Sequence, residues 1–303
     1  GHGVQKVTLH FTRHGPVLHG DGTRAYALRT VWTEPGTAPY MASLAVMRAR
    51  SHQDYLAALR GWGCPSVNHI YADTQGDIVW KPSGAAPIRD GWEGLLPVPG
   101  DGRYEWAGYR DMDELPVEYN PQRNWVGSAN QNNLPAGYPN AEKKIGFEWT
   151  DPSRFNRISE VLDADRKFGL EDSMALQADN TSIQGRRVTA LLDGLQSSDP
   201  DVAEALRLLT SWNGVLTADS AAGALYEVWF MKHLRPAVVR ATVPKDAVEL
   251  VDKGGVRSGE PAAIIAVLEQ PDQRHHIGVR QEKSAQRRGH RSNASTKDRV
   301  IWL

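Results

Sequence analysis

The sequence predicts an α+β protein with a strand-rich first half and a helical second half. Residues 1–133 carry mainly alternating apolar and polar positions interrupted by Gly and Pro, which is typical of short strands joined by turns. In residues 134–270 the apolar positions recur instead at helical spacing. Because strands and helices do not alternate along the chain, the pattern favours segregated sheet and helix parts over repeated βαβ units.

The strand predictions rest on stretches that alternate in polarity and end at turn residues. These stretches are residues 4–11, 26–32, and the pair 68–73 and 77–80. Gly76, in the turn between the last two, suits a positive φ, so this pair is the clearest hairpin in the sequence. The run His14, Gly15 and Pro16 is expected to end the first strand. One interruption, residues 42–61, has helical spacing.

Helices dominate the prediction beyond residue 134. The first of them begins where Asp151 or Ser153 can act as its N-cap, which typically contributes about 1 kcal/mol. The later helices are predicted at residues 170–178, 186–195, 202–212 and 221–239. Residues 271–303 are basic and polar with few apolar side chains, so we expect a solvated or disordered tail there.

The composition excludes several classes of function. Lys and Arg number 35 against 36 acidic residues, so we expect neither nucleic acid nor a membrane as a partner. The single Cys64 rules out an internal disulfide, a thiol metal cluster and a Cys-x-x-Cys redox centre. No apolar run approaches the roughly 20 residues that a membrane span needs. Residues 1–6 lead directly into strand-like alternation, so we expect no signal peptide at this point.

Residues 125–131 are the most informative stretch of the chain. They are expected to form a short strand that ends by presenting the amide of Asn130, and Arg154 follows at the start of a helix. An Asn at a strand end and a nearby Arg contribute little to a core. They suit a site where a carbonyl oxygen gains negative charge, because a fixed amide N–H can stabilise that charge and a cation can orient the amide.

These residues belong to a series of short motifs that resembles the nucleophile-bearing subunit of the penicillin acylase (penicillin amidase) family. The resemblance extends from about residue 7 to about residue 233 and is strongest between residues 68 and 157. Each motif alone is common, but their joint order and spacing are specific. The motifs are Thr12–Val17, Tyr71–Ile78, Pro87–Arg89, Leu96–Gly100, Tyr104–Tyr109, Tyr119–Pro121, Ser128–Asn130, Tyr138–Pro139 and Trp149–Arg154.

The resemblance implies the αββα sandwich of the N-terminal-nucleophile hydrolases, of which this chain would form a part. In that family a precursor cuts itself, and the new chain begins with a Ser whose hydroxyl attacks the substrate amide. The free α-amine has a pKa near 8, so it can serve as the base. The implied substrates are linear amides, namely penicillin-type side chains, acyl-homoserine lactones or related N-acyl compounds. The implied partners are such a substrate, the smaller subunit released from the same precursor and the missing early part of this subunit. The implied location is the periplasm or outside the cell.

Both ends of the chain depart from the family pattern. The family's nucleophile lies far upstream of the motif that contains His14, whereas here His14 lies close to Gly1. After Val267 the family's closing strands and helix are not recognisable. We therefore expect an internal fragment that lacks the nucleophile and the early part of the subunit, is inactive alone, and ends in a tail foreign to the family.

The resemblance implies a role for two residues. Asn130 matches the Asn that donates its side-chain amide to the oxyanion, and Arg154 matches the Arg that holds that Asn in place. From the residues alone, Asn130 could equally be a turn residue, and Asn132 or Asn133 could take its role if the alignment shifts. Arg154 could be a solvated residue of a first helical turn, although the helix macrodipole mildly disfavours a cation there.

The resemblance also implies one structural calcium and no organic cofactor. Glu142 stands where many family members carry an acidic calcium ligand, and a hard cation accepts carboxylate oxygen. The alternative is a surface Glu beside Lys143 and Lys144.

Other candidates are weaker. His14 is expected to be structural at a strand bend, and Ser128 and Ser153 lack a recognisable base. The pair His275 and His276 has no third metal ligand at a suitable spacing. Two further functions stay open: a catalytically silent binding module on the same fold, and nucleic-acid association through the basic tail, which salt-dependent binding would reveal.

Overall fold

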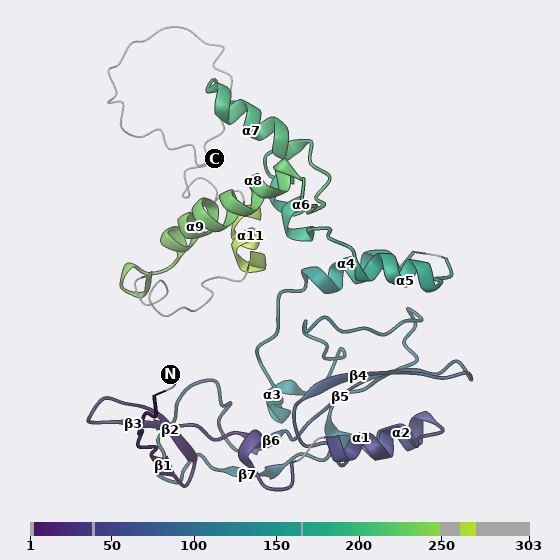
Figure 1. The fold of residues 1–303 in the computed structure, drawn as a ribbon, viewed down its shortest axis with the longest axis vertical. Coiled ribbons are helices and arrows are strands. Elements are labelled where there is room, and N and C mark those ends of the chain that lie inside the picture. The colour runs from purple at the N-terminus through teal and green to yellow at the C-terminus, as the bar shows by residue number, and fades with distance from the viewer. Residues whose placement is uncertain (1–2, 38–39, 165, 249–260, 271–303) are drawn as a thin grey trace. The chain divides into compact units, whose positions relative to one another are not determined.

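The computed structural model describes residues 3–37, 40–164, 166–248 and 261–270 of the chain (Figure 1). The tail 271–303, with His275 and His276, lies outside the described residues. The chain divides into two compact units. The first unit comprises residues 1–128 and 132–149, and the second comprises residues 129–131 and 150–303.

The first unit opens with a small antiparallel sheet in the order β1-β2-β3. Its strands are β1 (Phe11–Thr12), β2 (Gly15–Gly20) and β3 (Ala25–Ala27). The strand predicted at residues 4–11 is wrong except at its end. Val4, Val7 and Leu9 are 100%, 68% and 73% exposed, so the alternation there buries no apolar face in this structure.

The first strand ends at Thr12, directly before the run from His14 to Pro16, as predicted, and the sheet continues into β2 from Gly15. Gly15 has a φ of 122°, and a Cβ there would lie 2.1 Å from the Leu28 carbonyl oxygen, so only glycine fits. The strand predicted at residues 26–32 is limited to β3, because the chain then forms the 3₁₀ helix η1 (Val31–Thr33) with Thr30 as its N-cap.

The predicted hairpin at residues 68–80 is confirmed. It consists of β4 (Val67–Ala72) and β5 (Ile78–Ser83), with β8 (Glu118–Tyr119) on the other side of β5. The Asp73 carboxylate accepts hydrogen bonds from the backbone N–H groups of Gln75 and Asp77, at 2.9 and 3.1 Å, which fixes the turn. The central strand β5 is the most buried of the three. A separate two-stranded ladder pairs β6 (Pro87–Arg89) with β7 (Trp106–Tyr109).

The helical interruption predicted at residues 42–61 consists of two helices, α1 (Tyr40–Val46) and α2 (His52–Leu59). The break is local in origin, because Ser51 caps α2 by accepting a hydrogen bond from the Asp54 N–H at 3.1 Å. Leu59 at the end of α2 is fully buried and packs with Met112 and Leu115 in the core of the first unit.

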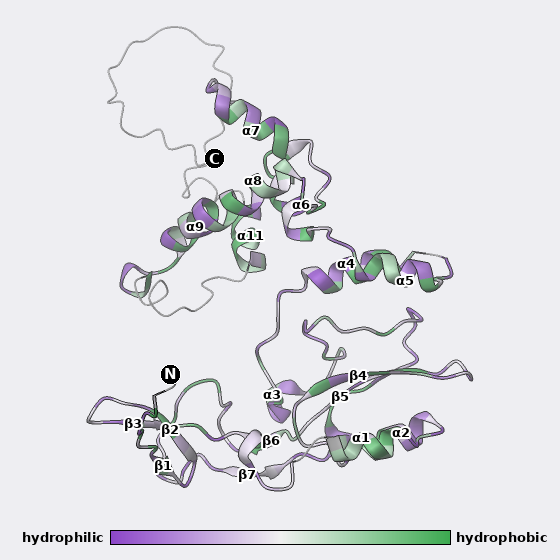
Figure 2. Cartoon of the chain, in the orientation of Figure 1, coloured by the Kyte–Doolittle hydropathy of each residue, from purple (hydrophilic) through white to green (hydrophobic). Residues whose placement is uncertain are grey.

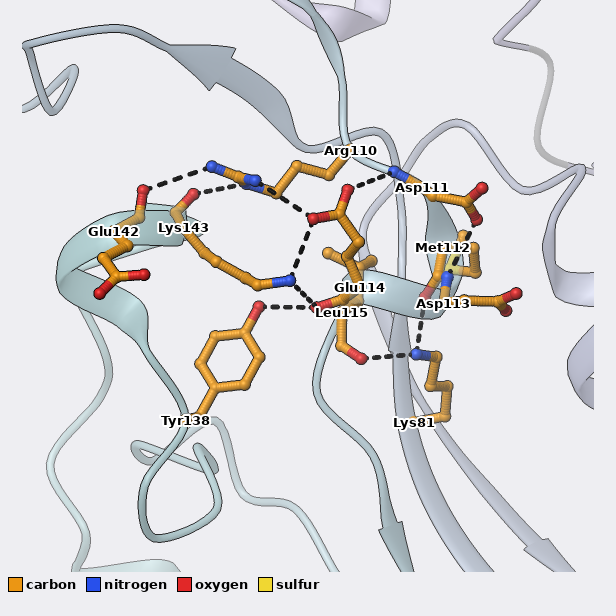
Figure 3. A network of polar contacts seen from close by, with 10 residues as sticks. All are labelled: Lys81, Arg110, Asp111, Met112, Asp113, Glu114, Leu115, Tyr138, Glu142 and Lys143. Carbon is orange, nitrogen blue, oxygen red and sulfur yellow. Dashed lines mark hydrogen bonds and ion pairs between the residues drawn. The ribbon is translucent and has the colours of Figure 1, made fainter.

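A buried lysine joins β5 to the 3₁₀ helix η2 (Met112–Glu114) (Figure 3). Lys81 is 5% exposed, and its Nζ donates to the backbone carbonyls of Met112 and Leu115, each at 2.7 Å. Burial lowers the pKa of Lys81 to about 8, although the carboxylates of Asp113 and Asp111 oppose this shift.

The same network holds the short helix α3 (Asn140–Lys143) (Figure 3). Arg110 donates from Nε to the Lys143 carbonyl at 2.7 Å and from Nη2 to the Glu142 carbonyl at 3.4 Å. Lys143 Nζ in turn pairs with Glu114 Oε1 at 3.0 Å. The guanidinium thus meets the last carbonyls of α3, where a cation is favoured.

The second unit is helical, as the spacing of its apolar residues predicts. Its helices are α4 (Ser153–Leu162), α5 (Leu170–Gln177), α6 (Ile183–Ala190), α7 (Pro200–Thr210), α8 (Ala221–Trp229), the π-helical turn η3 (Phe230–Leu234), α9 (Arg235–Thr242) and α11 (Pro261–Glu269). The helix predicted at 186–195 begins earlier, because Ser182 caps α6. Among the described helices, none combines the length and the apolar character that crossing a membrane requires.

The core of the second unit lies among α6, α7, α8, η3, α9 and α11. Its most buried members are Val188, Leu209, Tyr226, Val238 and Ile265, each at most 2% exposed. Figure 2 shows hydrophobic residues along α8 and α11. The helix predicted at 221–239 corresponds to α8, η3 and α9 in succession, with a π-helical turn that the periodicity did not indicate.

Candidate active site

The segment 125–131 is irregular, so the short strand predicted there is wrong. Asn130 has a φ of 64°, in the left-handed region that a strand ladder does not accept. The carbonyl groups of Ala129 and Asn130 bind residues 150 and 154 instead of a neighbouring strand. Asn is among the few residues other than Gly that tolerate this backbone conformation.

Asn130 is exposed between two buried neighbours. Ala129 and Gln131 are each 5% exposed. Gln131 Oε1 accepts a hydrogen bond from the Ala129 N–H at 2.8 Å. The backbone on both sides is therefore anchored in the protein, while the amide of Asn130 is presented at the surface of the second unit.

Arg154 contacts this turn from the start of α4. Its Nη2 donates to the Ala129 carbonyl at 2.7 Å and to Asn130 Oδ1 at 2.9 Å. Because the guanidinium has only donors, the Asn130 oxygen must face it. The Nδ2 end of the amide then points the opposite way, so the arrangement defines which end of Asn130 can donate to a substrate oxygen.

Two further contacts fix the start of α4. Asp151 Oδ1 accepts from the Ser153 N–H at 2.8 Å, so of the two predicted caps it is Asp151 that makes the contact, while Ser153 is the first helical residue. Asp151 Oδ2 also accepts from the Ala262 N–H at 3.0 Å, which ties α11 to this point. The backbone at the start of α4, which carries Arg154, is thereby connected to a core helix of the same unit.

Arg157, one turn further along α4, forms an ion pair with Asp179 near the site. It donates from Nε and Nη2 to Asp179 Oδ2 at 3.1 and 2.7 Å. This hydrogen bonding, opposed by partial burial, lowers the pKa of Asp179 to about 2. The pair holds α4 against the segment that precedes α6.

The other asparagines of the motif make contacts of their own in the first unit. Asn132 Oδ1 accepts from the Leu134 N–H at 3.1 Å, and Asn133 Nδ2 donates to Ser128 Oγ at 2.8 Å. Of the three candidate asparagines, Asn130 is the one whose side chain accepts a hydrogen bond from Arg154. Sequence reasoning assigned no role to Gln131, Thr150 or Asp179, because their partners are distant or their residue types are common in loops.

Glu142 lies at the surface of α3, with its carboxylate directed away from the network of Figure 3. Within the described residues no group of three or more His, Cys, Asp or Glu side chains is placed to hold a metal ion. One carboxylate does not make a calcium site, which needs six to eight oxygens. Glu142 belongs to no such group among the described residues, and the implied calcium stays a prediction.

His14 contributes to an ion-pair cluster in the first unit. Its Nε2 lies 2.8 Å from Glu105 Oε1, and Arg13 and Arg29 pair with the same carboxylate. The hydrogen bond from His14 is the main reason why the pKa of Glu105 is lowered. Two motifs of the sequence, Thr12–Val17 and Tyr104–Tyr109, meet here around the carboxylate of Glu105.

A family model described as penicillin amidase matches residues 1–300 of the chain. The chain belongs to the penicillin amidase family. Members similar to it include an acyl-homoserine lactone acylase, QuiP, of Pseudomonas aeruginosa, which is 28% identical over 269 residues. Penicillin G acylase of Escherichia coli is 29% identical over 255 residues. These alignments cover 80% and 78% of this chain but 31% and 30% of the two relatives.

The chain thus spans about a third of the length of the penicillin amidase relatives it matches. A solved structure, thermostable penicillin G acylase from Alcaligenes faecalis, superimposes with a TM-score of 0.64 at 25% identity. The superposition covers 83% of this chain and 47% of the chain from Alcaligenes faecalis. The likeness confirms the predicted α+β fold of the N-terminal-nucleophile hydrolases. The family is one of amide hydrolases.

Proposed function

We propose that the protein containing this chain hydrolyses linear N-acyl amides by acyl transfer, and that the chain supplies part of the oxyanion site. The observation that carries this proposal is the hydrogen bond from Arg154 Nη2 to Asn130 Oδ1 at 2.9 Å. It orients an exposed amide so that its N–H end is presented. Such a fixed donor stabilises the negative charge that develops on a carbonyl oxygen under attack.

In the proposed reaction, the hydroxyl of an N-terminal Ser outside these 303 residues attacks the substrate carbonyl carbon. Asn130 donates to the oxygen of the tetrahedral intermediate. The C–N bond then breaks, the amine leaves with the proton given up by the hydroxyl, and water hydrolyses the resulting ester. Arg154 keeps its charge throughout and acts by holding Asn130.

The names of the relatives support the substrate class. They act on acyl-homoserine lactones or on penicillin G, and both are N-acyl amides. A further relative, from a Pseudomonas species, is named as a proenzyme. We accordingly propose a processed precursor with a smaller subunit, in the periplasm or outside the cell. A structural calcium at Glu142 stays a prediction without support from the surrounding residues.

The test uses the full-length polypeptide that contains these residues. After expression, mass spectrometry identifies the new N-terminus, and amine release is measured from phenylacetyl anilides and from acyl-homoserine lactones. We expect hydrolysis of at least one class, with a loss in Asn130→Ala. A folded, processed protein that hydrolyses neither class would instead favour a catalytically silent binding module.

A further inference from the structure

Thr150 binds two consecutive carbonyl groups of the turn that carries Asn130. Its backbone N–H donates to the Asn130 carbonyl at 2.8 Å, and its hydroxyl donates to the Ala129 carbonyl at 3.1 Å. These two carbonyls flank the Cα of Asn130. One residue therefore restrains the rotation of the backbone on both sides of the exposed amide.

The Ala129 carbonyl is shared by two donors. Besides the Thr150 hydroxyl, it accepts from Arg154 Nη2 at 2.7 Å. A carbonyl oxygen has two lone pairs, so both hydrogen bonds can be made together. The nitrogen of Arg154 that holds the Asn130 side chain thus shares an acceptor with the Thr150 hydroxyl, which couples the positions of the two residues.

The turn needs such restraint because its backbone is unfavourable on its own. Asn130 has a φ of 64°, a region that Asn tolerates better than most residues but that still costs free energy unless the surroundings stabilise it. Relaxation to an extended conformation would move the amide. A displacement of about 1 Å in a catalytic donor can reduce a rate by about a hundredfold.

We propose that Thr150 is a positioning residue for the oxyanion donor, acting through its hydroxyl on the backbone of Asn130. This inference rests on the proposed function, because positioning matters only if Asn130 donates to the substrate. Thr150 itself touches the Ala129 and Asn130 carbonyls and is not assigned to the reacting atoms.

The test compares Thr150→Val with Thr150→Ser in the full-length amidase. Valine keeps the shape and the backbone N–H but removes the hydroxyl, whereas serine keeps the hydroxyl. We expect Thr150→Val to lower kcat about tenfold with KM changed less than about twofold, and Thr150→Ser to restore most of kcat. Thr150 is exposed, so both proteins should fold, and Thr150→Ala provides a second variant without the hydroxyl.

Thr210→Val is the matched control. The Thr210 hydroxyl makes a similar hydrogen bond, to the Leu206 carbonyl at 2.8 Å on α7, so its loss should leave kcat unchanged. The double variant Asn130→Ala/Thr150→Val separates positioning from a general structural effect. If Thr150 acts through Asn130, kcat of the double variant equals that of Asn130→Ala; independent effects would multiply.

Three results would overturn the inference: wild-type kcat in Thr150→Val and Thr150→Ala, failure of Thr150→Ser to restore activity, or effects that multiply in the double variant. In each case a low kcat in Asn130→Ala leaves the proposed function standing. Wild-type kcat in Asn130→Ala would overturn the oxyanion role of Asn130, and the inference with it.

Discussion

Arg154 and Asn130 are joined by a hydrogen bond from Nη2 to Oδ1 at 2.9 Å, across a separation of 24 residues. The donor lies in the first turn of α4, where a cation gains nothing from the helix dipole. The acceptor lies in a left-handed turn. Two locally unfavourable choices therefore meet in one contact, which is the pattern expected where function rather than folding selects the residues.

The first prediction concerns Asn130→Ala in the full-length polypeptide. If Asn130 donates to the oxyanion as proposed, its loss should lower kcat by about 10²–10³, or about 3–4 kcal/mol, while KM changes little, because such a donor acts mainly as charge develops. Steady-state kinetics on a phenylacetyl anilide measure both constants. Correct processing must be verified by mass spectrometry, since self-cleavage could need the same residue.

Asn132→Ala and Asn133→Ala serve as controls for the first prediction. Both side chains make hydrogen bonds within the first unit, so each variant should keep kcat within about threefold of wild type. Wild-type activity in Asn130→Ala combined with a loss in either control would show that the oxyanion role belongs to that other residue.

The second prediction concerns Arg154→Lys. Both hydrogen bonds come from Arg154 Nη2, and the shorter lysine side chain cannot place its nitrogen at the same point, so we expect kcat to fall about tenfold or more. The thermal midpoint should change little, because Arg154 is exposed. Arg157→Lys, one turn away, should show the reverse, with lower stability and a smaller effect on kcat, because its partner is Asp179. Equal kinetic losses in both variants would contradict a specific role for Arg154.

The third prediction concerns the stability of the second unit in acid. The pKa of Asp179 is about 2 in the folded protein against 3.8 in the unfolded chain. Its contribution is therefore complete above pH 4 and is lost as the pH falls from about 4 to about 2. Allowing for solvent screening, Asp179→Asn should cost about 1–2 kcal/mol at pH 7 and much less near pH 2.

Urea unfolding at a series of pH values measures this difference. Glu204→Gln is the control, because Glu204 pairs with Arg207 within one helix. The two side chains are 61% and 66% exposed, respectively. Exposed pairs contribute little, so this variant should unfold at nearly the same urea concentration as wild type at every pH. A pH-independent deficit in Asp179→Asn would argue against the ion pair as its cause.

The fourth prediction concerns Lys81 at alkaline pH. Its pKa falls from 10.5 to about 8 on folding. Between these values the unfolded chain binds more protons than the folded protein, so the free energy of unfolding contributed by Lys81 rises with pH across that window. The rise should be about 2 kcal/mol after allowance for screening.

Lys81→Met should remove this rise and lower stability at pH 7, because two backbone carbonyls lose their donor. Lys232→Met, at an exposed position on η3, should leave the pH dependence as in wild type. Unfolding curves between pH 7 and pH 10.5 provide the comparison. An unchanged slope in Lys81→Met would mean that another group titrates in this window.

Local patterns predicted the elements whose causes are local. The hairpin around Gly76 follows from alternation and a turn residue, and both appear in its structure. The helices of the second unit follow from apolar spacing, with ends displaced by caps such as Ser182. Residues 4–11 misled the prediction because alternation makes a strand only where one face is buried, and here the apolar side chains are exposed.

For the candidate site, too, the sequence predicted some features and the structure alone revealed the others. The motif order, together with the chemical suitability of an Asn and an Arg, identified Asn130 and Arg154 as candidates. The left-handed turn, the anchoring by Gln131 and the double contact of Thr150 had no detectable signal in the sequence. Each depends on which backbone groups lie within hydrogen-bonding distance, and residue types do not reveal that.

The sequence by itself determined the α+β class, the hairpin, most of the helices and the membership of the penicillin amidase family, because periodicity and motif order are properties of neighbouring residues. Only the tertiary structure decided that Arg154 orients Asn130, that Thr150 restrains the same turn and that Lys81 is buried among carbonyls. These contacts join residues 20 or more positions apart. Their distances follow from the packing of the whole chain, which no local pattern encodes.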